Sequence, residues 1–434
     1  MTDVTIRKAE RLKGEVSAPP SKAYTQRMLM ASALAHGTSR LSGPLVSDDT
    51  EAALRAVTAL GAKVKATGDC WKVEGAQPLK AAQKPIDCGD SGATLRFTIP
   101  VAASASESSV FLLGKSLEKR PIVPLLQSLR QLGVEAYHQH LNGKASIVVK
   151  GGGIVGGKTT IRGDISSQFI SGLMFACPLA RKDTEITLTT PLESKEYVKM
   201  TQAVLAEHGI CIRISEEFDC IHVPANQTYN PCSHRVPGDF SSAAFLFAAA
   251  AVTSSDVCVR NLDYETMQGD KAILNVLKRM GVKGKVYPGR VEVEGKGGLL
   301  EAVDVDARDI PDLVPVCTVL ACYAKGTSKI HDAHRLRYKE SDRLLSLYLE
   351  LTKMGAQIAV NEGTVTVCGP CVLKGAEVEP HNDHRIAMAC AVAGLGASGE
   401  TCIQNAECVR KSYPSFFIDL RLLGVDIVGG KFDR

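Results

Sequence analysis

Seven basic residues are candidates for binding a small, doubly charged anion. They fall in short motifs: Lys22 and Arg27 in PPSKAYTQR, Arg96 in GDSGATLR, Arg120 in EKRPI, Arg343 in RYKESDR, Arg385 in NDHR and Lys411 in VRKSYPSF. Each residue alone is more often a solvated surface charge. Guanidinium groups pair with carboxylate and phosphate through two parallel hydrogen bonds, so the set as a whole predicts an anion pocket.

Two carboxylates accompany these motifs. Asp312 lies in DIPD, and Glu340 is flanked by Lys339 and Arg343. An acid beside two cations stays ionised unless it is buried, so proton transfer requires a site that closes and excludes water. We therefore expect proton transfer at an anion site.

Helix starts recur beside the basic residues. Each has an acid or Asn-Asp, then small polar residues, then an apolar run: SDDTEAALRAV, GDSGATLRFTI, GDISSQFISGLM, GDFSSAAFLFAA and NDHRIAMACAV. Asp, Ser and Asn are good N-caps, and a nearly all-apolar helix is buried with its positive end at a surface. Ordinary capping explains any one of these starts, but it does not explain the basic residues beside them.

A longer repeat organises the chain. Six segments read as a helix that ends at glycine and an alternating strand after it, with the glycines at Gly61, Gly133, Gly209, Gly281, Gly355 and Gly424. A helix C-cap favours glycine because the residue there takes a left-handed conformation. We interpret the chain as six copies of one unit.

One stretch suggests a different chemistry. GGIVGGKT, residues 152–159, fits the phosphate-binding loop of nucleotide hydrolases, which needs a strand before it and a helix after it. The following TTIRG is β-branched and ends at a Gly-Asp turn. We therefore favour a glycine-rich turn between two strands over an ATP site.

The cysteines give little functional signal. In a long chain without a secretion signal, fourteen cysteines most often behave as small buried hydrophobic residues. The pair in Cys368-Gly-Pro-Cys371 resembles a redox motif, but its flanks predict strand, turn and strand. We favour a plain β-turn.

Composition excludes several classes of protein. With 434 residues, 45% of them hydrophobic, the chain can form two or three domains, and its formal charge of +4 is spread too evenly for a nucleic-acid binder. The longest apolar runs are too short to span a bilayer. We expect a cytoplasmic protein.

The ordered motifs resemble the 5-enolpyruvylshikimate-3-phosphate synthase family. They are PSK…R, GDSG…LR, RPI, SSQF, SKEY, GD-x-SSA, IPD, KESDR, NDHR and KSYP, and they cover essentially the whole chain. The resemblance implies a mixed α+β fold, an inverted α/β prism of two domains. Each domain has three βαβαββ units with buried helices and outer sheets. It also implies transfer of the enolpyruvyl group of phosphoenolpyruvate to the 5-hydroxyl of shikimate 3-phosphate, by addition and elimination, with no cofactor or metal, in a monomer.

The resemblance also assigns residues. For catalysis it implies Asp312 as proton acceptor, Glu340 as the proton donor to the methylene carbon, and Lys22. The residues implied for shikimate 3-phosphate are Ser21, Lys22, Arg27, Ser166, Ser167, Gln168, Ser194, Tyr197, Asp312 and Lys339. Those implied for phosphoenolpyruvate are Lys22, Gly92, Arg120, Gln168, Arg343, Arg385 and Lys411.

Some positions depart from the family pattern. Ala23 stands where a serine is usual, Ala93 where a threonine is usual, and Arg335 where an asparagine is frequent. The alternative is the sister transferase that acts on UDP-N-acetylglucosamine, whose hallmark is a cysteine in the loop before the RP motif. That loop here has Lys115 and no cysteine. A non-catalytic anion-binding module, the third possibility, would not need Asp312 and Glu340.

The family architecture predicts where the chain crosses between its domains. We expect one domain from residues 15–235 and the other from residues 1–14 with 236–434. A cleft between them is expected to close on the sugar phosphate, because closure brings the cations together and excludes water.

Overall fold

The computed structural model describes residues 2–295 and 299–430 and divides the chain into two compact units. Unit 1 is Met1–Pro20 with Pro237–Arg434, and unit 2 is Ser21–Val236. Each unit has its own continuous hydrophobic core. Strand β2 (Glu15–Ser17) pairs in parallel with β15 (Asp256–Arg260), so residues 15–20 belong to unit 1, not to the second domain as expected.

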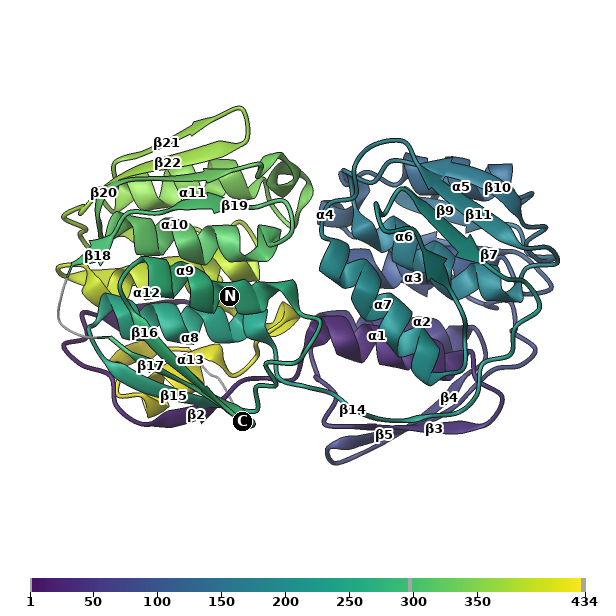
Figure 1. Cartoon of the computed structure of the whole chain (residues 1–434), viewed down its shortest axis with the longest axis horizontal. Helices are drawn as coiled ribbons and strands as arrows, with labels where there is room; N and C mark the ends of the chain where they lie inside the picture. The colour runs from purple at the N-terminus through teal and green to yellow at the C-terminus, as the bar shows by residue number, and fades with distance from the viewer. Residues whose placement is uncertain (1, 296–298, 431–434) are drawn as a thin grey trace. The chain divides into compact units, whose positions relative to one another are not determined.

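Unit 2 (purple to teal in Figure 1) is built from three sheets and the helices that they surround. Its helices are α1 (Lys22–Ala33), α2 (Asp48–Ala59), α3 (Gly92–Ala102), α4 (Lys115–Glu118), α5 (Val123–Gln131), α6 (Ser167–Ala176) with the short η1 (Cys177–Leu179), and α7 (Lys195–Glu207). In spatial order, its sheets are β14 (Ser233–Arg235), β3 (Thr38–Ser42), β5 (Cys70–Glu74), β4 (Lys63–Thr67); β6 (Ile86–Asp87), β7 (Ser109–Leu112), β9 (Lys144–Val149), β8 (Ala136–Leu141); and β10 (Gly157–Ile161), β11 (Thr184–Leu188), β13 (Cys220–Val223), β12 (Arg213–Ile214).

Unit 1 is also built from three sheets and a set of helices. Its helices are α8 (Phe240–Val252), α9 (Ile273–Arg279), α10 (Val314–Cys322), α11 (Arg343–Lys353), α12 (His384–Gly396) and α13 (Phe416–Leu422), with short turns η2 (Gly269–Ala272), η3 (Pro311–Leu313), η4 (His334–Tyr338) and η5 (Ala406–Lys411). Its sheets are β23 (Glu377–Val378), β24 (Glu400–Ile403), β1 (Val4–Arg7), β25 (Ile427–Gly429); β16 (Lys283–Tyr287), β17 (Arg290–Glu294), β15, β2; and β18 (Leu300–Glu301), β20 (Ala324–His331), β22 (Thr364–Gly369), β21 (Ile358–Asn361), with β19 (Asp304–Asp306) also on β20.

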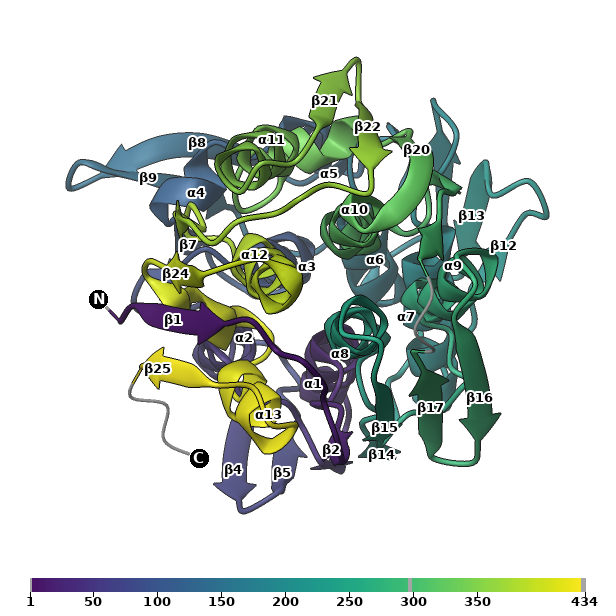
Figure 2. The ribbon, with the colours of Figure 1, turned by 90° about the vertical axis from the view of Figure 1, so that its left-hand side faces the viewer.

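The most apolar helices lie at the centre of each unit. In unit 1, α8, α10 and α12 contact one another, and Figure 2 shows them surrounded by strands. All residues of α10 and nearly all of α8 and α12 are buried. In unit 2, α3 is buried along its whole length and contacts α1 and α6. A helix that is apolar on every side is stable in water only when other elements cover it, which explains why the sheets lie outside. The expected α+β fold with buried helices is confirmed.

The helix ends follow the local rules of the sequence. All six repeated glycines have a positive φ, between 80° and 105°. The five expected helix starts have the N-caps Ser47, Ser91, Ser166, Asp239 and Asp383, and in each case the side chain accepts a hydrogen bond from a backbone N–H of the first turn. The described residues contain six sheets, which is consistent with six copies of one unit.

The structure also tests the nucleotide-binding motif at residues 152–159 and the redox motif at Cys368 and Cys371. After the glycine-rich stretch the chain enters strand β10, which pairs in parallel with β11, and no helix begins there. Lys158 is exposed and forms an ion pair with Glu185, 3.1 Å between Nζ and Oε1. Cys368 lies in strand β22, and no helix begins at Cys371. None of the described helices is both long and apolar enough for a membrane span.

Candidate active site

The expected site residues lie at or near helix starts, and each unit holds a share. In unit 2 they are Ser21, Lys22 and Arg27 at α1; Gly92 at α3; Arg120 after α4; Ser166, Ser167 and Gln168 at α6; and Ser194 and Tyr197 at α7. In unit 1 they are Asp312 in η3; Lys339 and Glu340 before α11; Arg343 at its first residue; Arg385 in α12; and Lys411 at the end of η5.

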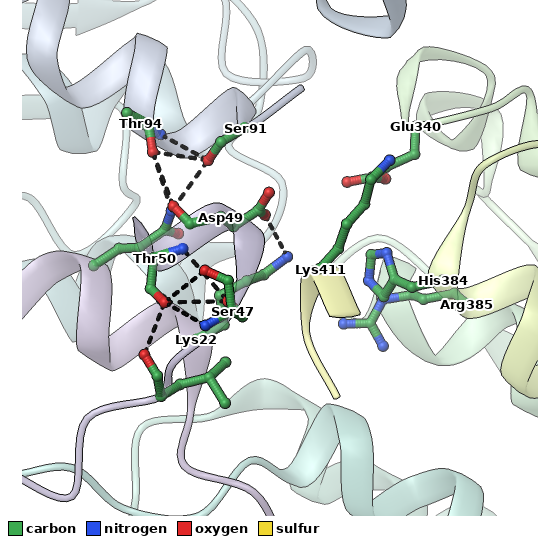
Figure 3. Close-up of polar contacts among 12 residues, drawn as sticks. Lys22, Ser47, Asp49, Thr50, Ser91, Thr94, Glu340, His384, Arg385 and Lys411 are labelled. Atoms are coloured by element: carbon green, nitrogen blue, oxygen red, sulfur yellow. Dashed lines mark hydrogen bonds and ion pairs between the residues drawn. The ribbon is translucent and has the colours of Figure 1, made fainter. Parts of the chain in front are cut away.

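Lys22 is the first residue of α1, and an acid holds its side chain (Figure 3). Its Nζ lies 2.8 Å from Oδ2 of Asp49, in the first turn of α2, and both side chains are at least four-fifths buried. The amide of Gln26, one turn further along α1, donates to the Asp49 carbonyl and to Ser91 Oγ. These contacts bring the starts of α1, α2 and α3 together around one lysine.

Gly92, the first residue of α3, lies next to the side chains of a second cluster. A Cβ atom placed on Gly92 would come 3.0 Å from Nη1 of Arg120 and 3.4 Å from Oε1 of Gln168. That same Gln168 oxygen accepts a hydrogen bond of 2.8 Å from Nη1 of Arg96, which also reaches Ser166. The absence of a side chain at Gly92 therefore allows two guanidinium groups and an amide to approach the start of α3.

Gly92→Ala is expected to raise the KM for the anionic substrate expected at this cluster roughly fivefold, which corresponds to about 1 kcal/mol of binding free energy. The added methyl group displaces the Arg120 guanidinium by a few tenths of an ångström, while Gln168 and Arg96 stay at ordinary van der Waals distances. Steady-state kinetics with each substrate varied in turn checks this result. Gly143→Ala, at a positive φ in a strand turn with no heavy atom near its Cβ, is the control for a general loss of stability. An unchanged KM in Gly92→Ala would contradict the placement.

Arg27 forms a third cluster with the start of α7. Its Nε donates to Thr201 Oγ1 at 2.8 Å, and its Nη2 donates to the Tyr197 carbonyl at 3.3 Å. The guanidinium carbon lies 5.2 Å from the Phe97 ring centroid and 5.5 Å from that of Tyr197. Burial lowers the pKa of Arg27 to about 10, which still leaves it charged at neutral pH. Arg27 and Tyr197, both expected at the sugar-phosphate site, are thus in contact. Ser194, the third such residue here, is the N-cap of α7, the helix that contains Tyr197.

In unit 1, the centre of the cluster is the Arg343 side chain, of which only 1% is exposed. Its Nη1 lies 2.8 Å from Asp312 Oδ1, and its Nη2 lies 2.6 Å from Glu340 Oε2. Its Nε donates to Oδ2 of Asp383, the N-cap of α12, at 2.8 Å. Three carboxylates therefore hold one guanidinium, and two of them are the expected proton-transfer groups.

Asp312 is surrounded by cations. Besides Arg343, it has Nζ of Lys339 at 3.5 Å and Nη2 of Arg385 at 3.3 Å. Burial alone would raise the pKa of the Asp312 carboxyl, but Arg385, Lys339 and Arg343 together hold it well below its usual range. Burial lowers the pKa of Lys339 to about 8, although Asp312 favours its charged form. The site thus contains a firmly ionised acid beside a lysine that can lose its proton near neutral pH.

The remaining two cations of unit 1 flank the start of α12. Arg385 lies in the first turn of this helix, and its Nη1 donates to the Asp312 carbonyl. Nζ of Lys411 donates to the Asn382 carbonyl at 2.7 Å. Figure 3 shows Arg385, His384 and Lys411 around this helix end. Both residues are more than nine-tenths buried, so only a small part of each is accessible to solvent.

Some members of these clusters were not predicted as site residues. They are the acids Asp49, Asp383 and Asp270. Asp49 and Asp383 lie in motifs that predict a helix start, but nothing in the sequence indicates which cations they contact. Asp270 is buried and accepts from the Ser241 hydroxyl. Burial and, to a smaller extent, the negative charge of Asp312 raise the pKa of Asp270 to about 7. The positive charge of Arg385 acts in the opposite direction. Its sequence, MQGDKAIL, carries no distinguishing signal.

Comparison with known proteins gives a consistent result. Residues 6–420 match the family described as EPSP synthase, 3-phosphoshikimate 1-carboxyvinyltransferase. The chain is 42% identical over 425 residues to the 3-phosphoshikimate 1-carboxyvinyltransferase of Methanocaldococcus jannaschii, with 97% of this chain and 98% of that protein covered. It is 44% identical to the enzyme of the same name from Methanocella arvoryzae, with 95% and 97% covered.

Comparison with solved structures points to the same family. The EPSP synthase of Acinetobacter baumannii, solved at 2.37 Å, superposes with a TM-score of 0.83 at 25% identity and covers 99% of this chain and 100% of that one. These matches support the shikimate enzyme and give no support to the sister transferase that acts on UDP-N-acetylglucosamine.

Proposed function

The chain belongs to the EPSP synthase family, and on that premise we propose that it transfers the enolpyruvyl group of phosphoenolpyruvate to the 5-hydroxyl of shikimate 3-phosphate and releases phosphate. One observation carries the proposal. Asp312 and Glu340, the acids expected for proton transfer, share a single buried guanidinium, that of Arg343. A fixed pair of acids among cations suits a reaction between two anions that also moves protons.

Addition requires two proton movements. Glu340 donates a proton to the methylene carbon of phosphoenolpyruvate, while the substrate hydroxyl loses its proton and attacks the neighbouring carbon. Asp312 is the proposed acceptor of that hydroxyl proton. Because its pKa is held so low, Asp312 accepts this proton as a weak base, beside the Lys339 ammonium 3.5 Å away. The product is a tetrahedral intermediate in which the former methylene is a methyl group.

Elimination reverses the first proton movement. Glu340, now ionised, takes a proton from the methyl group, the carbon–oxygen bond to phosphate breaks, and the enol ether forms. The departing phosphate takes up the proton that the substrate hydroxyl gave to Asp312. Arg343 stabilises the ionised form of Glu340 at 2.6 Å, so this contact favours the proton donation of the addition step.

The cations of each unit are proposed to bind the substrates' charged groups. Arg120, Gln168 and Lys22 of unit 2, and Arg385 and Lys411 of unit 1, are assigned to phosphoenolpyruvate. Arg343 is assigned to it as well, but its nitrogen atoms already contact three carboxylates, so it binds substrate only by exchanging one of these contacts. Ser166, Ser167, Gln168, Arg27, Ser194 and Tyr197 are assigned to shikimate 3-phosphate, since serine hydroxyls and N–H groups at a helix start suit a phosphate.

Calorimetric titration with shikimate 3-phosphate, UDP-N-acetylglucosamine and ATP separates the candidate substrates, and an assay of phosphate release from phosphoenolpyruvate tests the reaction. We expect binding of the first compound alone, and phosphate release that requires it. Phosphate release that requires UDP-N-acetylglucosamine instead would overturn the proposal. The chain is also proposed to act as a monomer in the cytoplasm, and light scattering of the purified protein tests the monomer.

The affinity for shikimate 3-phosphate is expected to fall as pH rises through about 8. Lys339 is assigned to bind this substrate as a cation, and its pKa of about 8, instead of the usual 10.5, means that the cation is lost near that pH. If only the charged form binds, the Kd rises roughly tenfold between pH 7 and pH 9. Calorimetry at the two pH values measures the change.

Lys339→Arg provides the control for this prediction. Arginine keeps its charge at pH 9, so the Kd of this variant should change by less than about twofold over the same range. A wild-type Kd that stays constant, or a variant with the same pH dependence as wild type, would contradict the assignment of Lys339.

A further inference from the structure

A second cluster of chemically active side chains lies where α7 ends and β14 begins. It contains Glu207, His208, Cys232 and His234, all in unit 2. Nδ1 of His234 lies 2.9 Å from Glu207 Oε2, and Cys232 Sγ lies 4.0 Å from the same oxygen. None of these residues is among those assigned to the substrates.

The hydrogen bonds fix the tautomers of the two histidines. Nδ1 of His208 lies 2.6 Å from the Asn230 carbonyl, which only accepts, so this nitrogen carries a proton. Both rings are almost completely buried, and a doubly protonated His208 would be a buried cation with only neutral groups in contact. Its Nε2 therefore accepts, and His234 Nε2, 2.8 Å away, donates to it.

This arrangement leaves two acceptors facing each other. A neutral His234 that donates from Nε2 has a lone pair on Nδ1, and that lone pair points at the Glu207 carboxylate 2.9 Å away. Two acceptors at this distance repel unless a positive charge lies between them. That charge is either a proton or a metal ion.

We propose that Glu207 Oε2, Cys232 Sγ and His234 Nδ1 bind a divalent zinc-type ion, with water as its fourth ligand. The three atoms lie within 4.8 Å of one another. Tetrahedral zinc, with bonds of about 2.0 Å to nitrogen and oxygen and about 2.3 Å to sulfur, separates its ligand atoms by about 3.3–3.6 Å. The separations of 2.9 Å and 4.0 Å each differ from this range by about half an ångström or less.

The surroundings hold two of the ligands in place. His234 lies in β14, where it pairs with Leu41 of β3, and the Cys232 backbone N–H donates to Ser39 Oγ. His208 binds the second nitrogen of the His234 ring, which is the outer contact that zinc-ligating histidines usually have. Glu207 is half-exposed, so the ion has a route from solvent.

A comparable group in unit 1 lacks these properties. Asp306, His331 and Asp332 also lie close together, but all three are at least partly exposed. Nη2 of Arg308 lies 2.5 Å from Asp306 Oδ2, so an arginine already supplies the positive charge. This second group serves as a control site.

The proposed ion has a structural consequence. It joins the end of α7 to the strand that returns the chain toward unit 1, and it links residues 207 and 234 across the hairpin of β12 and β13. An ion that binds only the folded state stabilises it, so zinc in hundredfold excess over its Kd should raise the Tm of unit 2 by roughly 5–10 °C. Turnover at moderate temperature should be unaffected.

The test uses the full chain, reduced and stripped of metal with a chelator. Equilibrium dialysis with zinc chloride should give one ion per chain, and cobalt chloride should produce the near-ultraviolet charge-transfer absorption of a thiolate–cobalt bond. Cys232→Ser should abolish that absorption, and Glu207→Gln should weaken zinc binding more than about tenfold. The controls Cys211→Ser, at an exposed cysteine of the same unit, and His331→Ala should leave both signals unchanged.

Three outcomes would overturn the proposal: no stoichiometric zinc, no thiolate–cobalt absorption in the wild-type chain, or an absorption that persists in Cys232→Ser. Either of the first two would show that no such ion lies between His234 and Glu207. The cobalt spectrum of the wild-type chain decides the question even if a variant fails to fold. Circular dichroism of each variant identifies such a failure.

Discussion

Glu340→Gln is expected to lower turnover by about a hundredfold to ten-thousandfold, the usual contribution of a positioned acid or base. Glutamine has the same shape and still accepts a hydrogen bond from Arg343 Nη2, so the network around Arg343 stays in place. It cannot donate a carboxylic proton or accept one from carbon. The Kd for shikimate 3-phosphate should therefore change less than about threefold, because only the transition state needs the proton.

Rapid-quench kinetics and calorimetry on the purified variant measure the two quantities. Glu301→Gln, at an exposed carboxylate of unit 1, is the matched control and should keep wild-type turnover. If Glu340→Gln retains more than about a tenth of wild-type turnover, Glu340 is not the proton donor.

Lys22→Ala should cost at least about a hundredfold in turnover, the scale seen when a preorganised electrostatic contact is removed. Lys22 begins α1, so its ammonium adds to the positive potential of that helix end. Asp49 Oδ2, 2.8 Å away, holds the ammonium in position before substrate arrives. The variant also leaves Asp49 without its cation, so circular dichroism should confirm that it is folded.

Lys158→Ala is the control, because the two lysines belong to the two rival phosphate motifs. Lys158 is exposed on strand β10 with Glu185 as its partner, so turnover should stay near that of wild type and stability should change by less than about 0.5 kcal/mol. Both variants should be assayed for phosphate release from phosphoenolpyruvate and from ATP. An inactive Lys158→Ala beside an active Lys22→Ala, or ATP turnover that depends on Lys158, would reverse the assignment.

Local rules of the sequence were enough to predict the helix ends. A glycine at a C-cap and a Ser or Asp at an N-cap act over three or four residues, so their effects are visible in the sequence itself. That is why Gly61 and Gly424 have the expected positive φ and why Ser91 and Asp383 begin helices. The rejection of the nucleotide motif depended on the same kind of information, because a β-branched run after the lysine predicts a strand.

The partners of the charged residues could not be predicted in this way. Arg343 and Asp383 are forty residues apart in sequence, and Lys22 and Asp49 twenty-seven. Such pairs depend on how helices pack, which no local pattern specifies. The first domain crossing shows the same limit, because residues 15–17 are identified with unit 1 only by their pairing with β15.

The pairing of β1 bears on how the chain folds during its synthesis. Arg7 pairs with Glu400, and Thr5 with Val428, so β1 completes its sheet only after nearly the whole chain has been made. At about 5–20 residues per second, the ribosome needs roughly 20–80 s to reach Glu400 after Arg7. Unit 2 contains all its own strands and can fold within that interval. Meanwhile β1 has unpaired edges, which a nascent-chain chaperone would protect from aggregation.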